Sequence, residues 1–227
     1  MKIIKICLFF IFSIFLISNY VFAGLDEDKK INYAIEVLKD IQEIPEAGIP
    51  PNLLKNSYGI IIIPGLVKVG FYVGATYGQG ILMIKNNNIW SSPCFVKITG
   101  GSFGLQIGAQ STDIILVFKS QKSIDAITKG KITLGADAAV AAGPVGRMVG
   151  AGTDIKLQSE IFSYSRSRGL FAGIALEGSA IQIDDNANIN FYKKEVSAKD
   201  ILYKNIVSNP VNVNSLKNQL QKCINIK

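Results

Sequence analysis

The sequence predicts an α+β fold: a strongly curved, largely antiparallel, barrel-like β-sheet with helices at the N- and C-terminal ends of the chain. Three observations favour this class. Short apolar or alternating runs separated by turn residues fill the middle of the chain, as in antiparallel sheets. Helical periodicity is concentrated at the two ends. Glycines gather on one face of two expected strands, where bare backbone permits strong coiling.

The domain organisation is simple. With 227 residues and 48% hydrophobic side chains, the chain can bury one sizeable core but is too short for two full domains. Residues 1–23 are set apart because Lys2 and Lys5 precede an apolar run that ends in small residues at Ala23, which predicts a secretory signal peptide. The run is shorter than the roughly 20 residues of a membrane-spanning helix. Residues 24–227 then form a single domain, and we expect an exported protein in a periplasm or outside the cell, free or peripheral at a membrane.

The first expected helix begins at Asp26, where three successive acids suit the positive end of a helix, and it stops at Pro45. Its apolar side chains recur at the helical period, which favours a helix packed on the core over one that faces a membrane. A short helical turn follows at Pro50-Pro51. The apolar stripe consists of Ile31, Ala34, Ile35, Leu38 and Ile41.

The expected strands occupy the middle of the chain. Turns are indicated at Pro64-Gly65 and at Asn86-Asn87-Asn88, and a brief helix at 123–129 interrupts the series. The strands are expected at 58–63, 67–77, 81–85, 95–99, 103–109, 114–118, 131–142, 154–165, 170–177, 180–183 and 189–192.

Helix returns at the C-terminus. Ser197 to Asp200 form a start that resembles a capping box. Pro210 breaks the chain, and a last amphipathic stretch follows. Its apolar positions are Val213, Leu216, Leu220 and Ile224.

In two expected strands the glycines occupy alternate positions, so they lie on one face of the sheet. Because strand side chains alternate between faces, the even-numbered Gly70, Gly74, Gly78 and Gly80 share one face, and bulky apolar residues share the other. Residues 100–110 repeat this pattern. A bare face allows strong curvature, close packing of a helix, or access for a ligand, and we favour curvature. None of the glycine runs has the context of a nucleotide-binding loop.

The sequence contains no histidine, which removes Ser-His-Asp and Cys-His catalysis and most catalytic zinc sites. We therefore expect a protein that is not an enzyme and has neither metal nor cofactor. A carboxylate hydrolase built on Asp137 and Glu177 is the remaining catalytic alternative, although no spacing brings these two together. Cys94 and Cys223 could pair in an oxidising compartment, but nothing in the sequence places them side by side.

Basic residues give the chain a formal net charge of +7, which removal of residues 1–23 lowers by two. An exported basic protein meets anionic lipid headgroups and acidic polymers more often than nucleic acid, so we expect no nucleic-acid partner. The charge could equally serve solubility alone.

Arginine is scarce: only Arg147, Arg166 and Arg168 occur among 24 basic residues. A planar guanidinium can bind phosphate or carboxylate through two parallel hydrogen bonds, which a lysine ammonium cannot do. The three arginines are therefore candidate residues for binding lipid headgroups. The alternative is that they form structural ion pairs, for which the candidate acids are Asp137, Asp154 and Glu177.

Six blocks of sequence carry a family resemblance: residues 58–64, 69–74, 90–93, 100–113, 134–147 and 163–173. In order and spacing they resemble the lipid-binding SYLF domain family, in its exported bacterial branch, from about residue 30 to 205. The resemblance implies a non-enzymatic module that binds phospholipids through basic surface and an N-terminal amphipathic segment. That segment corresponds to residues 29–39 here, which adds Lys29 and Lys30 to the candidate headgroup contacts.

The expected partner is a phospholipid or an anionic membrane surface. Some members of the family that this chain resembles also bind actin and carry Src-homology-3 or zinc-finger domains. This sequence shows neither domain, and actin is not expected to be a partner of an exported protein. The alternative function is an envelope protein–protein interaction or scaffold module without specific lipid binding.

Overall fold

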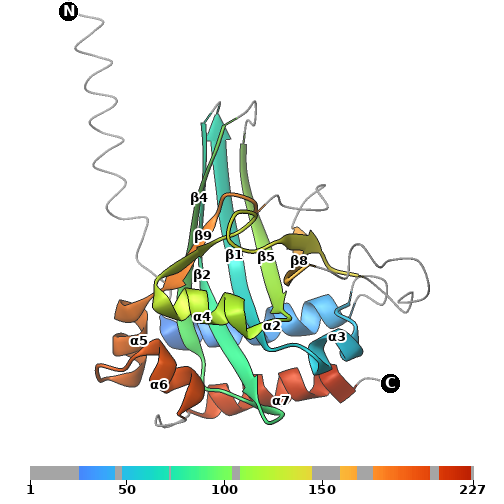
Figure 1. Cartoon of the computed structure of the whole chain (residues 1–227), viewed down its shortest axis with the longest axis vertical. Coiled ribbons are helices and arrows are strands. Elements are labelled where there is room, and N and C mark those ends of the chain that lie inside the picture. The colour runs from blue at the N-terminus through green and yellow to red at the C-terminus, as the bar shows by residue number, and fades with distance from the viewer. Residues whose placement is uncertain are drawn as a thin grey trace, which may run out of the picture.

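A computed structural model describes residues 26–43, 48–71, 73–103, 108–144, 159–167, 176–204 and 210–225. The predicted signal peptide, Pro45, Arg147, Asp154 and Arg168 lie outside these residues. Within them, the chain forms a strongly curled sheet that makes a half-barrel, with helices gathered around its lower end in Figure 1. The predicted α+β class, the curved sheet and the terminal helices are confirmed.

Nine strands make up the sheet in the described residues, in the spatial order β6-β9-β4-β2-β1-β5-β8-β7, with β3 paired to β2. The pairs are antiparallel apart from β7 with β8. The strands are β1 Gly59–Phe71, β2 Val73–Asn86, β3 Ile89–Trp90, β4 Cys94–Phe103, β5 Gly108–Phe118, β6 Lys131–Thr133, β7 Val140–Ala142, β8 Ile161–Ser167 and β9 Ala180–Ile183.

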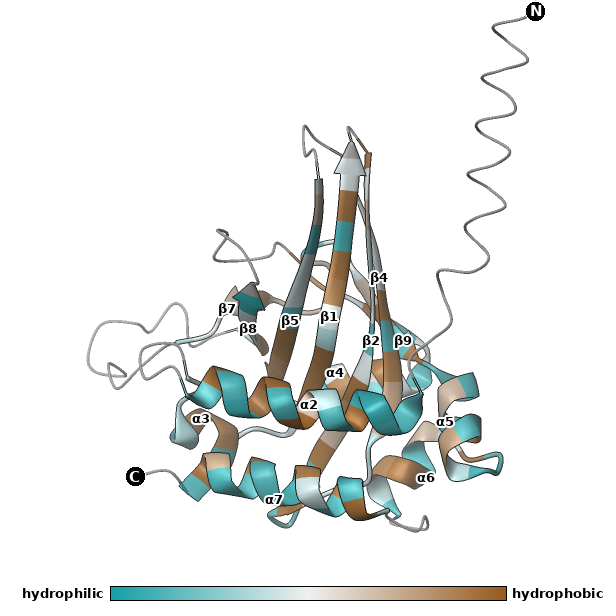
Figure 2. Cartoon of the chain, turned by 180° about the vertical axis from the view of Figure 1, so that it is seen from behind, coloured by the Kyte–Doolittle hydropathy of each residue, from teal (hydrophilic) through white to brown (hydrophobic). Residues whose placement is uncertain are grey.

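Helices cover both faces of the sheet at its lower end. The long helices α2 and α7 lie on one side, and α4 lies on the other (Figures 1 and 2). The helices are α2 Glu27–Gln42, α3 Pro51–Lys55, α4 Gln121–Lys129, α5 Asp185–Tyr192, α6 Ala198–Tyr203 and α7 Val211–Asn225.

Two hydrophobic cores result, one on each face of the sheet. On the face that we call the outer face, Ile60, Ile62 and Phe95 pack with the apolar stripes of α2 and α7. On the opposite, inner face, Ile61 and Leu82 pack with residues of α4, α6, β6 and β9. Because successive side chains point to opposite faces, both sets of positions in the lower strands must be apolar.

The inner face carries the glycines, and these make room for the chain itself. A Cβ atom added to Gly78 would lie 2.6 Å from Leu66 Cδ1 and 2.8 Å from Ile63 Cγ2. A Cβ atom on Gly80 would collide with the backbone of Ile62. At these positions the bare face therefore serves close packing of a curved sheet, which was the favoured of the three interpretations.

The predicted strand at 67–77 is wrong, because the chain reverses within it. Gly70 pairs with Gly74, so β1 and β2 form a hairpin. Pro64-Gly65 does not end the preceding strand but forms a bulge, at which the pairing register shifts. Gly65 has a φ of +64° there, and its N–H donates to Asp113 Oδ1 at 2.8 Å. Because Pro64 and Gly65 are accommodated in a bulge and do not end the strand, β1 continues for 13 residues.

Three other strand predictions are wrong. The strand expected at 103–109 spans two strands, because β4 ends at Phe103 and β5, which runs in the opposite direction, begins at Gly108. The remaining two fail for a local reason. Residues 189–192 belong to helix α5, because the Asp184 side chain caps this helix by accepting the N–H of Ala187. The expected strand at 131–142 is divided into β6 and β7 by a turn, in which Asp137 Oδ2 accepts the Thr133 N–H at 2.6 Å. Local side-chain hydrogen bonds override apolar periodicity in both places.

Other elements follow the prediction closely. The expected strands at 81–85, 95–99 and 114–118 are parts of the longer β2, β4 and β5, and the brief helix is α4. Ser197 Oγ accepts the N–H of Asp200 at 3.1 Å, which confirms the capped start of α6. The last amphipathic stretch is α7, whose apolar side chains lie in the outer core. The strands expected at 154–165 and 170–177 fall partly or mostly outside the described residues.

The two described cysteines are free and buried. Cys94 lies in the inner core and Cys223 in the outer core, so the sheet separates the two thiols. Burial raises the pKa of the Cys94 thiol to about 12. Neither thiol forms a disulfide within this fold.

Candidate functional site

Helix α2 carries the two lysines suggested by the family resemblance, and they differ sharply in exposure. Lys29 is exposed, whereas Lys30 is only 3% exposed and its Nζ lies 5.9 Å from the centroid of the Phe95 ring. The apolar stripe of α2 is buried in the outer core, which confirms the expected core packing. Lys30 therefore faces the sheet and is not placed to meet a membrane.

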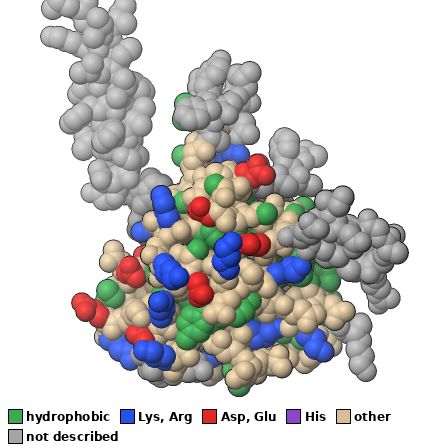
Figure 3. All heavy atoms as spheres, viewed as in Figure 1, with side chains coloured by type: hydrophobic (Ala, Val, Ile, Leu, Met, Phe, Trp, Pro, Cys, Tyr) green, Lys and Arg blue, Asp and Glu red, His purple; other side chains and the backbone are tan. Residues whose placement is uncertain are grey.

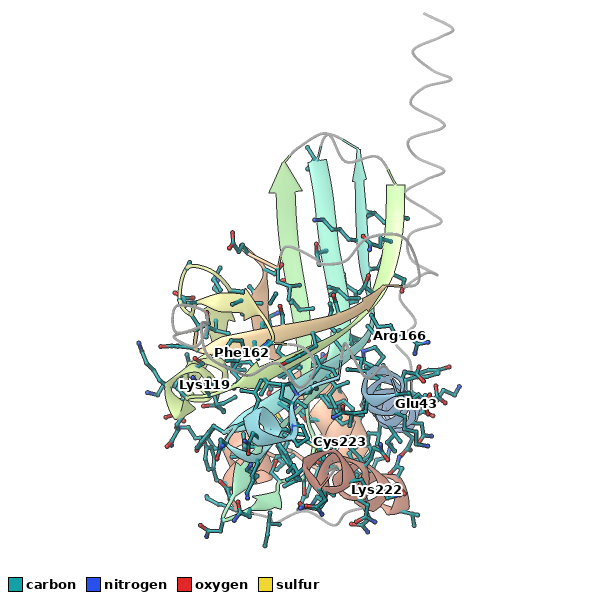
Figure 4. The ribbon with its side chains drawn as sticks, turned by 90° about the vertical axis from the view of Figure 1, so that its right-hand side faces the viewer. Glu43, Lys119, Phe162, Arg166, Lys222 and Cys223 are labelled. Carbon is teal, nitrogen blue, oxygen red and sulfur yellow. The ribbon has the colours of Figure 1, made fainter. Side chains whose placement is uncertain are left out.

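Arg166 on β8 forms an ion pair with Asp40 on α2, and each side chain is 37% exposed. The pair joins the sheet to the helix that crosses it, and Figure 4 shows Arg166 above α2 on the side of the molecule that carries Glu43. Asp40 was not among the acids expected as partners, since it lies 126 residues away in the sequence. The Arg166 side chain as a whole keeps more than a third of its surface in solvent.

The catalytic alternative gains little from the structure. A Cβ atom on Gly135 would lie 3.1 Å from Glu177 Cγ, so the turn that contains Asp137 does lie beside Glu177. The Asp137 carboxylate, however, holds that turn closed through the Thr133 N–H. Both acids are exposed, and the described residues contain no group of three or more potential metal ligands.

A partly exposed apolar surface lies on the outer face beyond α2. Strands β1, β2, β4 and β5 rise past the helices there, as Figure 2 shows. Val67, Val69 and Val73 are 42%, 43% and 60% exposed. Val67 lies opposite Tyr77 and Val69 opposite Ala75, and directly opposed residues share a face. We call this surface the distal outer face; it consists of Val67, Val69, Val73, Ala75, Tyr77 and Ala109.

A row of cationic and amide side chains crosses the outer face immediately below this surface. Lys97 on β4 lies opposite both Gln79 on β2 and Gln182 on β9. Gln182 in turn lies opposite Lys131 on β6, so all four side chains share the outer face. Arg166 continues the row on the same face at the far end of the sheet, on β8, where it lies opposite Asp113 on β5. We call Lys97, Lys131 and Arg166 the cation row.

Besides Asp40, two acids border the cation row, and both are tied into the fold. Asp113 is 7% exposed and accepts the Gly65 N–H in the bulge. Asp184 is 8% exposed, caps α5 and accepts a hydrogen bond from Gln79 Nε2 at 3.2 Å. Beyond the row, residues 67–77 and 98–112 contain Lys68 and no acid. The surface that reaches solvent is therefore apolar at its end and cationic at its base.

Sequence reasoning found Arg166 but missed Lys97 and Lys131. The two lysines come from distant segments, and only the pairing of β4 and β6 through β9 brings them together. One signal was present in the sequence: residues 47–112 contain four lysines and no aspartate or glutamate. An acid-free run of that length marks the strands that build the distal outer face.

Helix α4 offers a second basic surface, with an open depression of about 540 Å³. Acids share this surface: Lys122 Nζ lies 4.0 Å from Glu160 Oε1, and Asp125 Oδ1 accepts a hydrogen bond from Tyr203 OH. Figure 3 shows basic and acidic side chains mixed across this side of the molecule. The depression is lined by Gln121, Lys122, Asp125, Ala126 and Lys129. Its mixed charge makes it the weaker candidate for an anionic partner.

No helix in the described part of the chain combines the length and the apolar character needed to cross a bilayer.

Comparison with known proteins places this chain in a family. Residues 99–223 match the sequence profile described as Ysc84, Las17-binding protein actin regulator. The human SH3 domain-containing YSC84-like protein 1 is 33% identical over 177 residues, which cover 75% of this chain and 52% of the relative. LAS seventeen-binding protein 3 of Saccharomyces cerevisiae is 35% identical over 158 residues, 68% of this chain and 34% of the relative.

The chain spans about half the length, or less, of the curated relatives that it matches. These descriptions name binding and regulation and no catalysed reaction. The match over more than half of the chain shows that this protein belongs to the Ysc84 family, whose shared unit is the SYLF domain.

Proposed function

We propose that this protein is a non-enzymatic module that associates peripherally with anionic phospholipid membranes through the distal outer face and the cation row. The observation that carries the proposal is the cation row itself: Lys97, Lys131 and Arg166 lie at one level of the sheet, below an apolar surface without acids. A lysine or arginine near an anionic membrane contributes about 1 kcal/mol of attraction. Because Asp40 offsets the charge of Arg166, the two lysines together favour an anionic over a neutral surface by about 2 kcal/mol, roughly thirtyfold in binding.

The members of the cation row differ in the contact they offer. Lys97 and Lys131 supply point charges that act through solvent within about 10 Å at moderate salt. Arg166 can bind a phosphate through its planar fork only as far as its pairing with Asp40 permits. Lys30 is left out because it is buried, and Arg147 and Arg168 stay sequence predictions. Lys29, exposed on α2, is retained as a peripheral contributor.

The proposal is tested by co-sedimentation of the purified chain, without residues 1–23, with vesicles of phosphatidylcholine alone or mixed with phosphatidylglycerol. Lys97→Gln combined with Lys131→Gln is expected to weaken binding to the mixed vesicles about thirtyfold, because two charges are lost. Lys222→Gln, on the exposed side of α7, removes the same kind of charge far from the cation row and is the control.

The expected pattern is strong binding to the mixed vesicles at low salt, a steep decline as salt rises, and little change for Lys222→Gln. Equal binding to both kinds of vesicle, or equal loss in all lysine variants, would contradict a contact through the cation row.

Export is part of the proposal and rests on the signal-peptide pattern of residues 1–23. Expression of the full chain in a bacterial host, followed by mass spectrometry of the protein from the envelope fraction, is expected to find a mature chain that begins at Gly24. An intact Met1 in a cytosolic fraction would contradict export.

A second candidate function is a protein-interaction module. It is supported by the description of the family as Las17-binding and by the name of the yeast relative. The same exposed valines could then receive a peptide or another protein. Pull-down of one protein that resists high salt, with no lipid recovered, would favour this function over membrane binding.

A further inference from the structure

We propose that the end of the β1–β2 hairpin enters the bilayer, with Val69 and Val73 lying at the boundary between headgroups and acyl chains. This inference rests on the proposed function and adds how the contact is made. It assigns the exposed valines a ligand, the hydrocarbon edge of a phospholipid membrane, and leaves the headgroup contact to the lysines.

The exposure of the valines is the first argument. The cores bury nearly every large aliphatic side chain of the sheet, yet three valines on one surface are 42% to 60% exposed. Val69 lies beside Ala75 on one side and Ala109 on the other, so small apolar neighbours extend the patch across three strands. A contiguous exposed apolar patch on a soluble domain marks an interaction site.

The hydrogen bonding of the backbone is the second argument. Strands that enter a bilayer need their N–H and C=O groups paired, because no water is present to satisfy them. β1 and β2 are the central pair of the rising strands, flanked by β5 and β4. Gly70 pairs with both Gly74 and Gly108, and Val73 pairs with Phe103, so the ladders continue to the end of the hairpin. Within the described residues the β1–β2 pair therefore has a strand partner on each side, and the open edges of this end lie on the flanking strands, at residues 100–103 of β4 and 108–111 of β5.

The position of the charges is the third argument, and it selects a membrane from among apolar partners. At about 3.3 Å per residue, Lys68 lies about 10 Å along the strand from Phe71, and Lys97 about 20 Å from Phe103. Amphipathic segments bury their apolar side about 5–10 Å into the interface. Insertion to that depth puts Lys68 at the level of the phosphates. A tilt toward the outer face then lowers the valines into the membrane and brings the cation row to the headgroups.

The first test changes the apolar character and keeps the strand. Val69→Thr combined with Val73→Thr preserves the β-branched shape and exchanges two methyl groups for hydroxyls. Binding to phosphatidylcholine/phosphatidylglycerol vesicles is expected to fall about tenfold or more, because two apolar groups no longer leave water. Val211→Thr is the matched control: Val211 is 83% exposed at the start of α7, at the opposite end of the molecule. Its binding is expected to stay unchanged, and all variants should keep the parent's melting temperature within a few degrees.

The second test measures depth directly. Trp90, the one tryptophan of the chain, is 3% exposed and gives a constant background. A Val73→Trp variant is expected to show a blue-shifted emission on vesicles and quenching by lipids with brominated acyl chains. The same change at Val211 should show neither effect.

The outcomes separate the inference from the function on which it rests. Vesicle binding that persists while Trp at position 73 escapes quenching overturns insertion and leaves the headgroup contact standing. Failure of the parent chain to bind any anionic vesicle overturns both. A stable dimer without lipid, abolished by the double threonine variant and not by Val211→Thr, would show that a second copy covers the valines and would also overturn insertion.

Discussion

The substitution Gly80→Ala tests whether the bare inner face exists for the curvature of the sheet. A Cβ atom at this position would collide with the Ile62 carbonyl oxygen and lie 2.9 Å from both Ile62 C and Ile63 Cα. These are backbone atoms of the neighbouring strand, so no side-chain rotation can relieve the overlap. Overpacking of a rigid core typically destabilises by 1–3 kcal/mol, and a backbone collision belongs at the upper end, about 3 kcal/mol. For a chain of this length that corresponds to a melting temperature lower by about 6–12 °C.

Thermal unfolding followed by circular dichroism measures this effect, and Gly101→Ala supplies the control. A Cβ atom on Gly101 would meet only Gly74 O, at 3.9 Å. Alanine should fit there and leave stability unchanged or raised by up to about 1 kcal/mol, because it restricts the unfolded chain. Equal melting temperatures for Gly80→Ala and Gly101→Ala would refute the argument that Gly80 is required by close approach of the backbone.

Three further results are expected. Asp40→Asn removes the partner of Arg166. Since both side chains are 37% exposed, the free energy of unfolding should fall by no more than about 1 kcal/mol. Binding to anionic vesicles should rise about fivefold, because one negative charge beside the cation row disappears. Weaker vesicle binding by this variant would count against Arg166 as a headgroup contact. Ser197→Ala should cost about 1 kcal/mol in thermal unfolding through loss of the α6 cap, and no change would mean that the cap is redundant. Burial raises the pKa of Cys94 to about 12 against 9.0 in the unfolded chain, so the unfolded state loses its proton first and stability falls as pH rises above 9. By pH 10 this group should lower the unfolding free energy by about 1 kcal/mol, an effect that Cys94→Ala removes; an identical pH dependence in both proteins would contradict it.

The sheet could be predicted from the sequence wherever local pattern and burial agree. The run Ile60 to Ile63 is buried on both faces, and its continuous apolar pattern correctly predicts a strand. The prediction failed where a turn hides inside a strand-like run, because the hairpin between β1 and β2 contains valines and aromatic residues on both sides of its reversal. It failed again at the bulge, where Gly65 is held by Asp113, 48 residues further along the chain. A hydrogen bond of that separation leaves no trace in a local pattern.

The candidate site was less predictable than the fold. The scarcity of arginine pointed to Arg166, and the structure places it in the cation row. Its partner Asp40 could not be identified, because α2 meets β8 only through the stacking of the helix on the sheet. Nothing in the local sequence distinguishes Lys97 and Lys131 from the other lysines; they come together only because β9 pairs with both of their strands. Exposure of the valines depends on where the helices stop, which periodicity alone does not state.

Membrane contact through the distal outer face is tested most directly by hydrogen–deuterium exchange of the chain with and without phosphatidylglycerol-containing vesicles. We expect vesicles to protect peptides covering residues 67–77 and 97–103, and to leave the peptides of α7 unchanged. Protection confined to α4 or α7, with the hairpin peptides exchanging as in free protein, would contradict a membrane contact through the distal outer face.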